Sequence, residues 1–215
     1  LDGGHKVIVG LDAEYTQGHL KETQDKDTYY SFGKARQQGV HYDYEVDAYS
    51  IAPFIHAEWQ LADKLRATTG LRFEHTNYDY DNKIADGSTK ADGSDCSGIP
   101  YLSDHDDDDL TPKITVFTGP GKECLYQKPG DRDDTFNDWS PKFGLVYRAA
   151  ETHSLFSNLS RGHRAPQTTD LYRIQKDQIV AALDSEQADS LEIGMRGTFD
   201  QLGLSYDVSA FYMKK

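Results

Sequence analysis

The sequence predicts an all-β protein, an antiparallel meander of long strands that forms part of a transmembrane β-barrel. Hydrophobic and polar residues alternate along seven segments, which is the pattern of strands with one apolar face. Most segments are about ten to twelve residues long, close to the roughly 9–11 residues that a tilted strand needs to cross a bilayer. The connections are alternately long and short, as in barrels with short periplasmic turns and longer extracellular loops.

The predicted strands follow one another directly along the chain. The alternation covers residues 6–15, 49–59, 65–74, 139–148, 152–161, 190–199 and 202–212. The fifth segment is less regular, because Leu155 and Phe156 are adjacent. We expect the apolar side chains of each strand to face lipid and the polar ones, such as Arg72, Glu74 and Glu192, to face a water-filled lumen. Aromatic residues near the strand ends are candidates for an interfacial girdle, namely Trp59, Trp139, Tyr147, Phe199 and Tyr212.

The lengths of the connections predict which end of the strands faces the periplasm and which faces the outside of the cell. Residues 60–63, 149–152 and 200–201 form the short turns, and residues 17–47, 78–137 and 163–186 form the long loops. A compact soluble domain seldom carries structureless loops of such length. We therefore expect the short turns in the periplasm and the long loops outside. Because seven strands leave two free edges, residues 1–215 are interpreted as a partial barrel, with both ends as cuts in a longer protein.

Composition excludes several classes of protein. The net charge of −13 argues against nucleic acid as a partner. An aromatic content of 12% argues against a disordered chain. The sequence contains no run of about 18 apolar residues, so it predicts no membrane-spanning helix. Residues 79–138 hold 15 acidic against 6 basic side chains, which is typical of a solvated surface loop.

Both cysteines, Cys96 and Cys124, lie within this acidic loop. An even number of cysteines in a loop favours a disulfide in an oxidising compartment. In the chain-entropy account, closing this ring stabilises the loop by roughly 3–4 kcal/mol. Two free thiols are the alternative.

The sequence predicts neither catalytic residues, nor a cofactor, nor a metal site. Signatures of nucleophilic hydrolases, phosphate-binding loops, zinc proteases and dinucleotide folds are missing from the sequence. The acidic run from Asp104 to Asp109 offers oxygen ligands of the kind Ca²⁺ prefers. It lacks the spacing and the turn glycine of an EF-hand, so a solvated loop is favoured.

Three motifs between residues 139 and 197 resemble the second half of the barrel of TonB-dependent outer-membrane receptors. The first is Trp-Ser-Pro-Lys-Phe-Gly from Trp139, and the second is Ser-Arg-Gly-His-Arg-Ala-Pro from Ser160. The third combines Asp-Ser-Glu, ending at Glu186, with Ser-Leu-Glu-Ile-Gly from Ser190. The order and spacing of the three motifs carry the resemblance.

This resemblance implies a barrel of about 22 strands with a plugged lumen, in the outer membrane of a Gram-negative bacterium. It implies uptake of a scarce nutrient, such as a ferric siderophore, driven by contact with TonB. The plug and the TonB-contacting segment would lie upstream. His163, Arg164 and Tyr172 are the candidate ligand-binding residues. Haem is disfavoured as cargo, because no histidine lies between Pro166 and Glu186.

Two other readings remain open at this point. A secreted all-β module that binds glycans through exposed tyrosines is the main alternative. It would show turn signals every 8–12 residues, whereas the strands here are longer and the loops less even. The second alternative is a passive porin or an outer-membrane enzyme, but neither of these explains the order of the three motifs.

Overall fold

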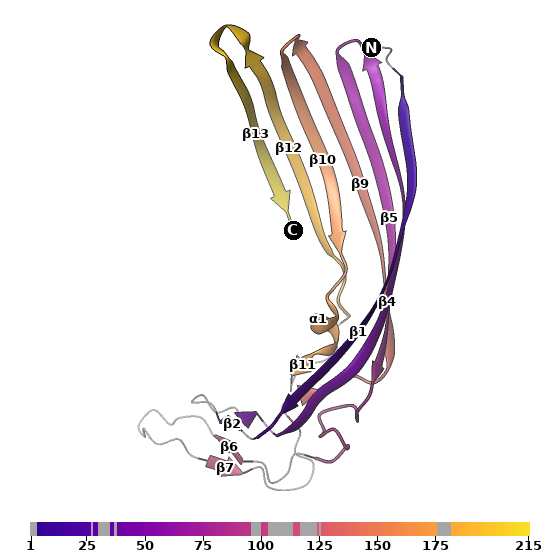
Figure 1. The fold of residues 1–215 in the computed structure, drawn as a ribbon, viewed down its shortest axis with the longest axis vertical. Coiled ribbons are helices and arrows are strands. Elements are labelled where there is room, and N and C mark those ends of the chain that lie inside the picture. Colours follow the sequence, from indigo (N-terminus) through magenta and orange to yellow (C-terminus); the bar gives the residue numbers. More distant parts are fainter. Residues whose placement is uncertain are drawn as a thin grey trace, which may run out of the picture.

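A computed structural model describes residues 4–26, 28–29, 35–36, 38–95, 100–102, 114–116, 124, 126–175 and 182–215. Most of these residues form one antiparallel sheet of seven strands in the order β1-β4-β5-β9-β10-β12-β13 (Figure 1). Its strands are β1 (Lys6–Gln24), β4 (Gly39–Ala62), β5 (Leu65–Asn82), β9 (Arg132–Ala150), β10 (His153–Arg164), β12 (Glu186–Phe199) and β13 (Leu204–Lys214). The predicted meander of seven long strands is confirmed.

Shorter elements occupy the long connections. Three two-stranded pairs are formed by β2 (Thr28–Tyr29) with β3 (Ala35–Arg36), β6 (Pro100–Leu102) with β7 (Ile114–Val116), and β8 (Tyr126–Gln127) with β11 (Ile174–Gln175). The helix α1 (Thr168–Tyr172) follows β10, and the 3₁₀ turn η1 (Asp200–Leu202) joins β12 to β13. Among the residues that the structure describes, no helix is long and apolar enough to cross a membrane.

The three short turns lie together at one end of the sheet and the long connections at the other (Figure 1). Two residues each separate β4 from β5 and β9 from β10. The third turn ends at Gly203, whose φ of +61° lies in the left-handed region that glycine adopts without steric cost. The predicted alternation of short and long connections is thus confirmed.

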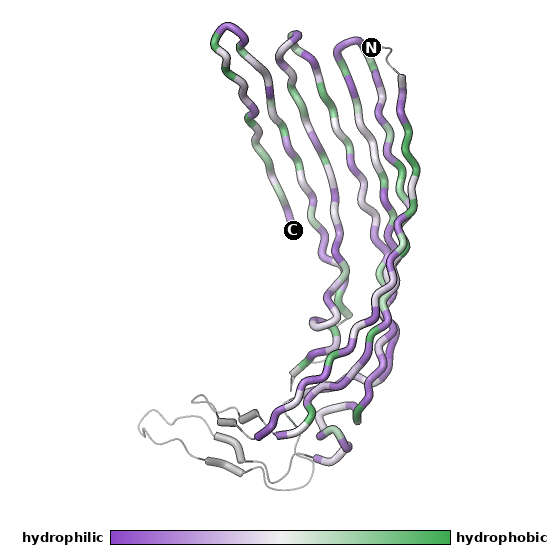
Figure 2. Tube along the Cα trace, viewed as in Figure 1, coloured by the Kyte–Doolittle hydropathy of each residue, from purple (hydrophilic) through white to green (hydrophobic). Residues whose placement is uncertain are grey.

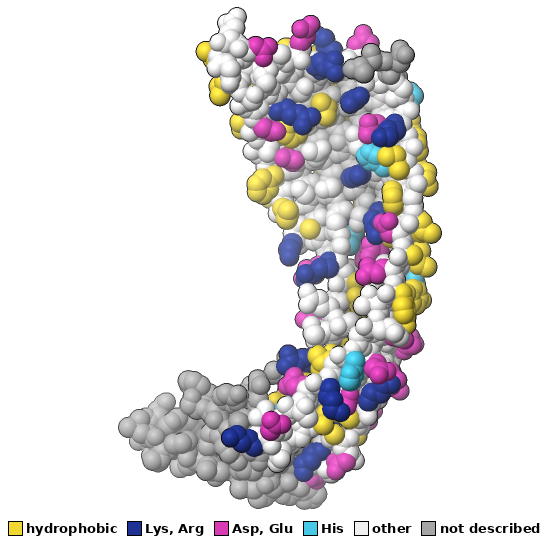
Figure 3. Space-filling view, in the orientation of Figure 1, with side chains coloured by type: hydrophobic (Ala, Val, Ile, Leu, Met, Phe, Trp, Pro, Cys, Tyr) yellow, Lys and Arg dark blue, Asp and Glu magenta, His cyan; other side chains and the backbone are white. Residues whose placement is uncertain are grey.

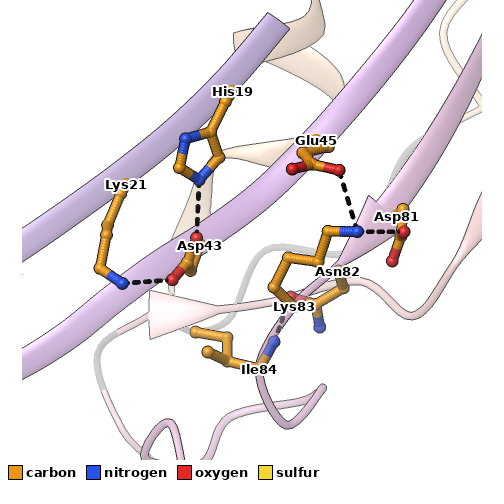
Figure 4. Close-up of polar contacts among 8 residues, drawn as sticks. All are labelled: His19, Lys21, Asp43, Glu45, Asp81, Asn82, Lys83 and Ile84. Atoms are coloured by element: carbon orange, nitrogen blue, oxygen red, sulfur yellow. Dashed lines mark hydrogen bonds and ion pairs between the residues drawn. The ribbon is translucent and has the colours of Figure 1, made fainter.

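The strands extend much further than the sequence predicts. Residues 17–24, 39–47, 78–82 and 132–137 were expected in loops, but they continue β1, β4, β5 and β9. Ion pairs join these extensions: Lys21 Nζ lies 2.6 Å from Asp43 Oδ2, and Lys83 contacts both Glu45, at 3.0 Å, and Asp81 (Figure 4). The outer face of these extensions is charged, and their apolar side chains, such as Tyr42, Tyr44 and Val46, lie on the inner face. The apolar face that predicts a lipid-facing strand is therefore missing from the outer side, even though the ladder continues.

The two faces of the sheet differ in character. From β1 to β12, odd-numbered residues share one face, the outer face, and even-numbered residues share the other, the inner face. Large apolar side chains on the outer face are exposed, with Val9 at 75% and Ile193 at 60%. Figure 2 shows apolar residues concentrated in the half near the short turns, and Figure 3 shows them along the edge of the molecule at β1. The outer face is therefore the predicted lipid-facing surface.

Aromatic residues mark both limits of this apolar surface. Tyr147 and Phe199 lie near the short turns, whereas Trp139 and Tyr212 lie on the outer face toward the long connections. Tyr147 and Trp139 are eight residues apart on β9, or about 26 Å at roughly 3.3 Å per residue. A tilt of about 35–45° reduces this to about 20 Å, comparable to the apolar band of a membrane barrel of about 25 Å.

The inner face is flattened by glycines placed opposite large side chains. Gly10 pairs with Phe54 and Gly194 pairs with Phe156 across neighbouring strands. Each ring lies over its glycine, so that an added Cβ would overlap the ring. The two phenylalanine rings therefore lie flat against the sheet and project little into the lumen.

Candidate functional site on the inner face

The connection after β10 folds back onto the inner face as a strap, residues 165–175. β10 ends at Arg164, and Pro166 follows, which removes a backbone donor and holds Ala165 extended. The helix α1 and the strand β11 come next and lie beside the sheet near the long connections (Figure 1). Leu171, Tyr172 and Ile174 of the strap are buried, so this segment is packed against the wall.

An aromatic core holds the strap. Tyr172 is 0% exposed, stacks on Tyr80 at a centroid distance of 4.2 Å and meets the edge of Tyr44 at 6.2 Å. Tyr42, Val46, Phe136 and Leu171 complete the buried cluster. Burial, followed by the hydrogen bond to Asp134, raises the pKa of the Tyr172 phenol, which therefore stays protonated and donates.

Polar contacts tie the strap to three strands. The Tyr172 hydroxyl donates to Asp134 Oδ2 on β9 at 2.9 Å, and the Tyr42 hydroxyl on β4 donates to the carbonyl oxygen of Ile174. Arg173 donates through Nε at 3.0 Å and Nη2 at 2.5 Å to Glu22 Oε2 on β1. With Tyr80 on β5, these contacts span β1, β4, β5 and β9.

Beneath the start of the strap runs a groove made of two adjoining pockets. The first measures about 480 Å³ and is lined by strands β1, β4 and β5 together with residues 163–165. The second measures about 260 Å³ and lies between β1, β4 and Thr168 and Thr169 of α1. Thr16 and Ala48 line both pockets, so the two form one continuous groove.

The larger pocket is charged, and most of its charges are paired. Arg72 donates from Nε to Glu74 Oε2 at 3.1 Å and also contacts Asp12 on β1. Arg164, on the opposite side of the pocket, lies 3.2 Å from Glu186 on β12. The smaller pocket is mostly apolar, with Leu20, Val46 and Ala48 in its lining. The groove therefore offers guanidinium and carboxylate groups at one end and an apolar surface at the other.

The structure brings two of the three candidate ligand residues together. His163 and Arg164 line the same pocket. The Nδ1 atom of His163 is buried without a hydrogen-bond partner in the described part of the chain. Tyr172 lies behind the groove and is fully buried, so in this arrangement it contacts the wall and positions the strap.

Several residues of the site carry no signal in the sequence. Asp12 and Glu14 enter the pocket from β1, about 150 positions before His163. Glu22 and Tyr42 lie in the segment expected to be a loop. The alternation did place Arg72 and Glu74 on the polar face, but only the curvature of the sheet brings them to the strap.

Two sequence predictions fall in the loop between β5 and β9. Cys124 is 2% exposed, whereas Cys96 lies outside the described residues, so the Cys96–Cys124 disulfide stays a prediction. The run from Asp104 to Asp109 also lies outside them. In the described ranges, no group of three or more His, Cys, Asp or Glu side chains is arranged to hold a metal ion.

Comparison with families of known proteins gives a match over the whole chain. A family model described as "TonB dependent receptor-like, beta-barrel" covers residues 1–215. A search of curated proteins found no match.

Proposed function

The chain belongs to the TonB-dependent receptor β-barrel family, and from this premise we propose that it forms part of the ligand-facing wall of a receptor for a scarce nutrient such as a ferric siderophore. The family consists of transport receptors of the Gram-negative outer membrane, so the protein is an outer-membrane transport receptor. This location rules out the secreted glycan-binding module. A seven-stranded sheet that exposes its apolar face agrees with the membrane location.

The observation that carries the proposal is the groove beneath the strap. It opens on the inner face, which is the lumen side of a barrel whose apolar side faces lipid. Ligand sites combine apolar lining with a few fixed polar groups, and this groove has both. A ferric siderophore is a bulky polar molecule with oxygen atoms on its surface, and Arg164 and His163 offer it donors.

The three candidate residues take different parts in this proposal. Arg164 contacts the ligand directly, since it belongs to the inner face and lines the larger pocket. His163 belongs to the outer face by its register, and it contributes to the lining of the same pocket at the end of β10. Tyr172 acts as a positioning residue, since it fixes the strap to β5 and β9. Arg72 holds Asp12 and Glu74 in place on the opposite wall.

We propose that the remaining barrel strands, the plug and the TonB-contacting segment lie outside residues 1–215. β1 and β13 are the edges of the sheet, and a spanning barrel has to pair every strand edge. The proposal is that further strands close the barrel to about 22, that a plug fills the lumen, and that TonB contacts the protein outside residues 1–215. No catalytic step is assigned to the chain.

Uptake by the full-length receptor tests the proposal. The receptor is expressed in a strain that lacks its own siderophore receptors, and growth under iron limitation is measured with one ferric hydroxamate and one ferric catecholate siderophore. Arg164→Ala is expected to reduce uptake of the transported siderophore. Arg161→Ala is the matched control, because Arg161 lies on the outer face of the same strand and pairs with Asp189. Growth that needs neither siderophore, with cobalamin or haem uptake in its place, would contradict the cargo assignment.

A further inference from the structure

A second pocket lies among the long connections, apart from the groove. It measures about 250 Å³ and shares no lining residue with the two pockets of the groove. Three segments form it: the start of β4, the turn at residues 89–92, and the segment from Cys124 to Lys128. The pocket lies among the long connections, beyond the apolar band whose limit on that side is marked by Trp139 and Tyr212.

Lys128 is the unusual residue in this pocket. Its side chain lines the pocket and is only 2% exposed. Its ammonium group donates to the carbonyl oxygen of Thr89. An ammonium group has three donors, and a buried charge without a charged partner is costly. Within the described residues, Lys128 forms no ion pair.

Two other lysines near the long connections, Lys21 and Lys83, form the kind of ion pair that Lys128 lacks in the described part of the chain. Lys21 lies 2.6 Å from Asp43 and Lys83 lies 3.0 Å from Glu45, although both lysines are about half or one-third exposed and could be solvated by water. Burial lowers the pKa of the Lys128 amine, and the charge of Asp86 opposes this without forming an ion pair. The most buried of these three lysines is therefore the one without an ion pair in the described part of the chain.

The walls of the pocket are flat and largely apolar. The rings of Tyr126 and His41 stack with centroids 3.8 Å apart and an interplanar angle of 18°, and both residues line the pocket. Gly39 also lines it, with a φ of +126° that favours glycine. The exposed Lys90 and Asp92 stand at the rim, and Asp92 is already satisfied by the backbone and hydroxyl of Ser94.

We propose that this pocket binds a small organic anion, a carboxylate carried on an aromatic or apolar group, with the Lys128 ammonium as its charged partner. The carboxylate supplies the missing counter-charge, and the ring fits between the Gly39 backbone and the Tyr126 side chain. A charge-assisted hydrogen bond of this kind is stronger than a neutral one. The site is independent of the siderophore proposal, because it uses other residues and its ligand is detected without transport.

Binding of sodium benzoate to the purified full-length receptor in detergent tests this proposal, by saturation-transfer NMR on the probe. Benzamide has the same shape without the charge and serves as the ligand control. Lys128→Gln keeps a donor for Thr89 and removes the charge. Lys64→Met removes an exposed charge from the turn between β4 and β5, away from the pocket. Benzoate is expected to bind at least about 10-fold more weakly to Lys128→Gln than to the unsubstituted receptor, and equally to Lys64→Met and the unsubstituted receptor.

Three results would overturn the proposal: no benzoate signal at millimolar probe, equal signals from benzoate and benzamide, or unchanged binding to Lys128→Gln. Lys128→Met is the second variant. Since it replaces an uncompensated buried charge with an apolar chain of similar length, it should not lower the thermal stability of the receptor. If Lys128 acts only as a structural donor to Thr89, Lys128→Met lowers stability while Lys128→Gln keeps benzoate binding.

Discussion

Replacing Tyr172 tests whether the aromatic core anchors the strap to the lumen wall. Tyr172 is fully buried, stacks on Tyr80 and donates to Asp134. Tyr172→Ala removes the ring and leaves a cavity between α1 and the sheet. Tyr172→Phe keeps the ring and removes only the hydroxyl. The two variants therefore separate packing from hydrogen bonding.

The expected magnitudes differ between the variants. Truncating a large buried aromatic side chain to alanine costs about 3–5 kcal/mol. Loss of a hydrogen bond to a charged group costs about 1.5–3 kcal/mol, and the value for Tyr172→Phe should lie at the lower end because Arg132 still contacts Asp134. Since about 1.4 kcal/mol is a factor of ten, strap opening should become about 10-fold more frequent in Tyr172→Phe and at least about 100-fold in Tyr172→Ala.

Hydrogen exchange measured by mass spectrometry on the full-length receptor reports this opening. The amide of Leu171 donates to the Gln167 carbonyl, and that of Arg173 donates to the Thr169 carbonyl, both at 3.2 Å. These amides exchange only when α1 opens, so their rates follow the opening equilibrium. Tyr212→Ala is the control, because Tyr212 lies on the outer face and is 68% exposed.

Unchanged exchange in Tyr172→Ala would refute the reasoning. It would mean that the ion pair between Arg173 and Glu22 holds the strap by itself. Exchange that rises equally in the control variant would instead show general loosening of the barrel, with no special part for Tyr172.

Three further predictions concern the sheet itself. Ile193→Arg places a charge at the lipid face and should cost about 2–4 kcal/mol, measured by refolding into lipid vesicles, whereas Ser190→Arg on the inner face of the same strand should cost much less. Gly194→Ala places a Cβ 2.7 Å from the Val208 carbonyl oxygen and against the ring of Phe156, so we expect a loss of about 1–3 kcal/mol in the same assay. Hydrogen bonds from Lys21 and His19 on β1 lower the pKa of the Asp43 carboxyl group below its usual 3.8. Its stabilising effect is therefore present above pH 3.8 and lost as pH falls through the lower folded value, and exchange at the ends of β1 and β4 should show no extra protection at neutral pH over pH 5.

The alternation of the sequence was a reliable guide wherever one face of the strand meets lipid. Ile193 and Arg72 were assigned to opposite faces, and the pairing of the strands places them so. The same method failed for the outer half of β4, where Asp43 and Glu45 stand on one face and Tyr42 and Tyr44 on the other. Tyrosine side chains end in a polar hydroxyl, and acidic residues are uncommon in strands. The segment therefore resembles a loop in the sequence.

Sequence alone determined the number and order of the long strands, the lipid-facing side of each and the two ends of the sheet, because these follow from local periodicity and turn length. Tertiary structure decided where the strap lies and which residues form the groove and the Lys128 pocket. Glu22, Tyr42, Asp134 and Arg173 are distant in the chain and meet only because the sheet curves and the strap folds inward. Such contacts depend on the packing of whole elements, which no local pattern of residues encodes.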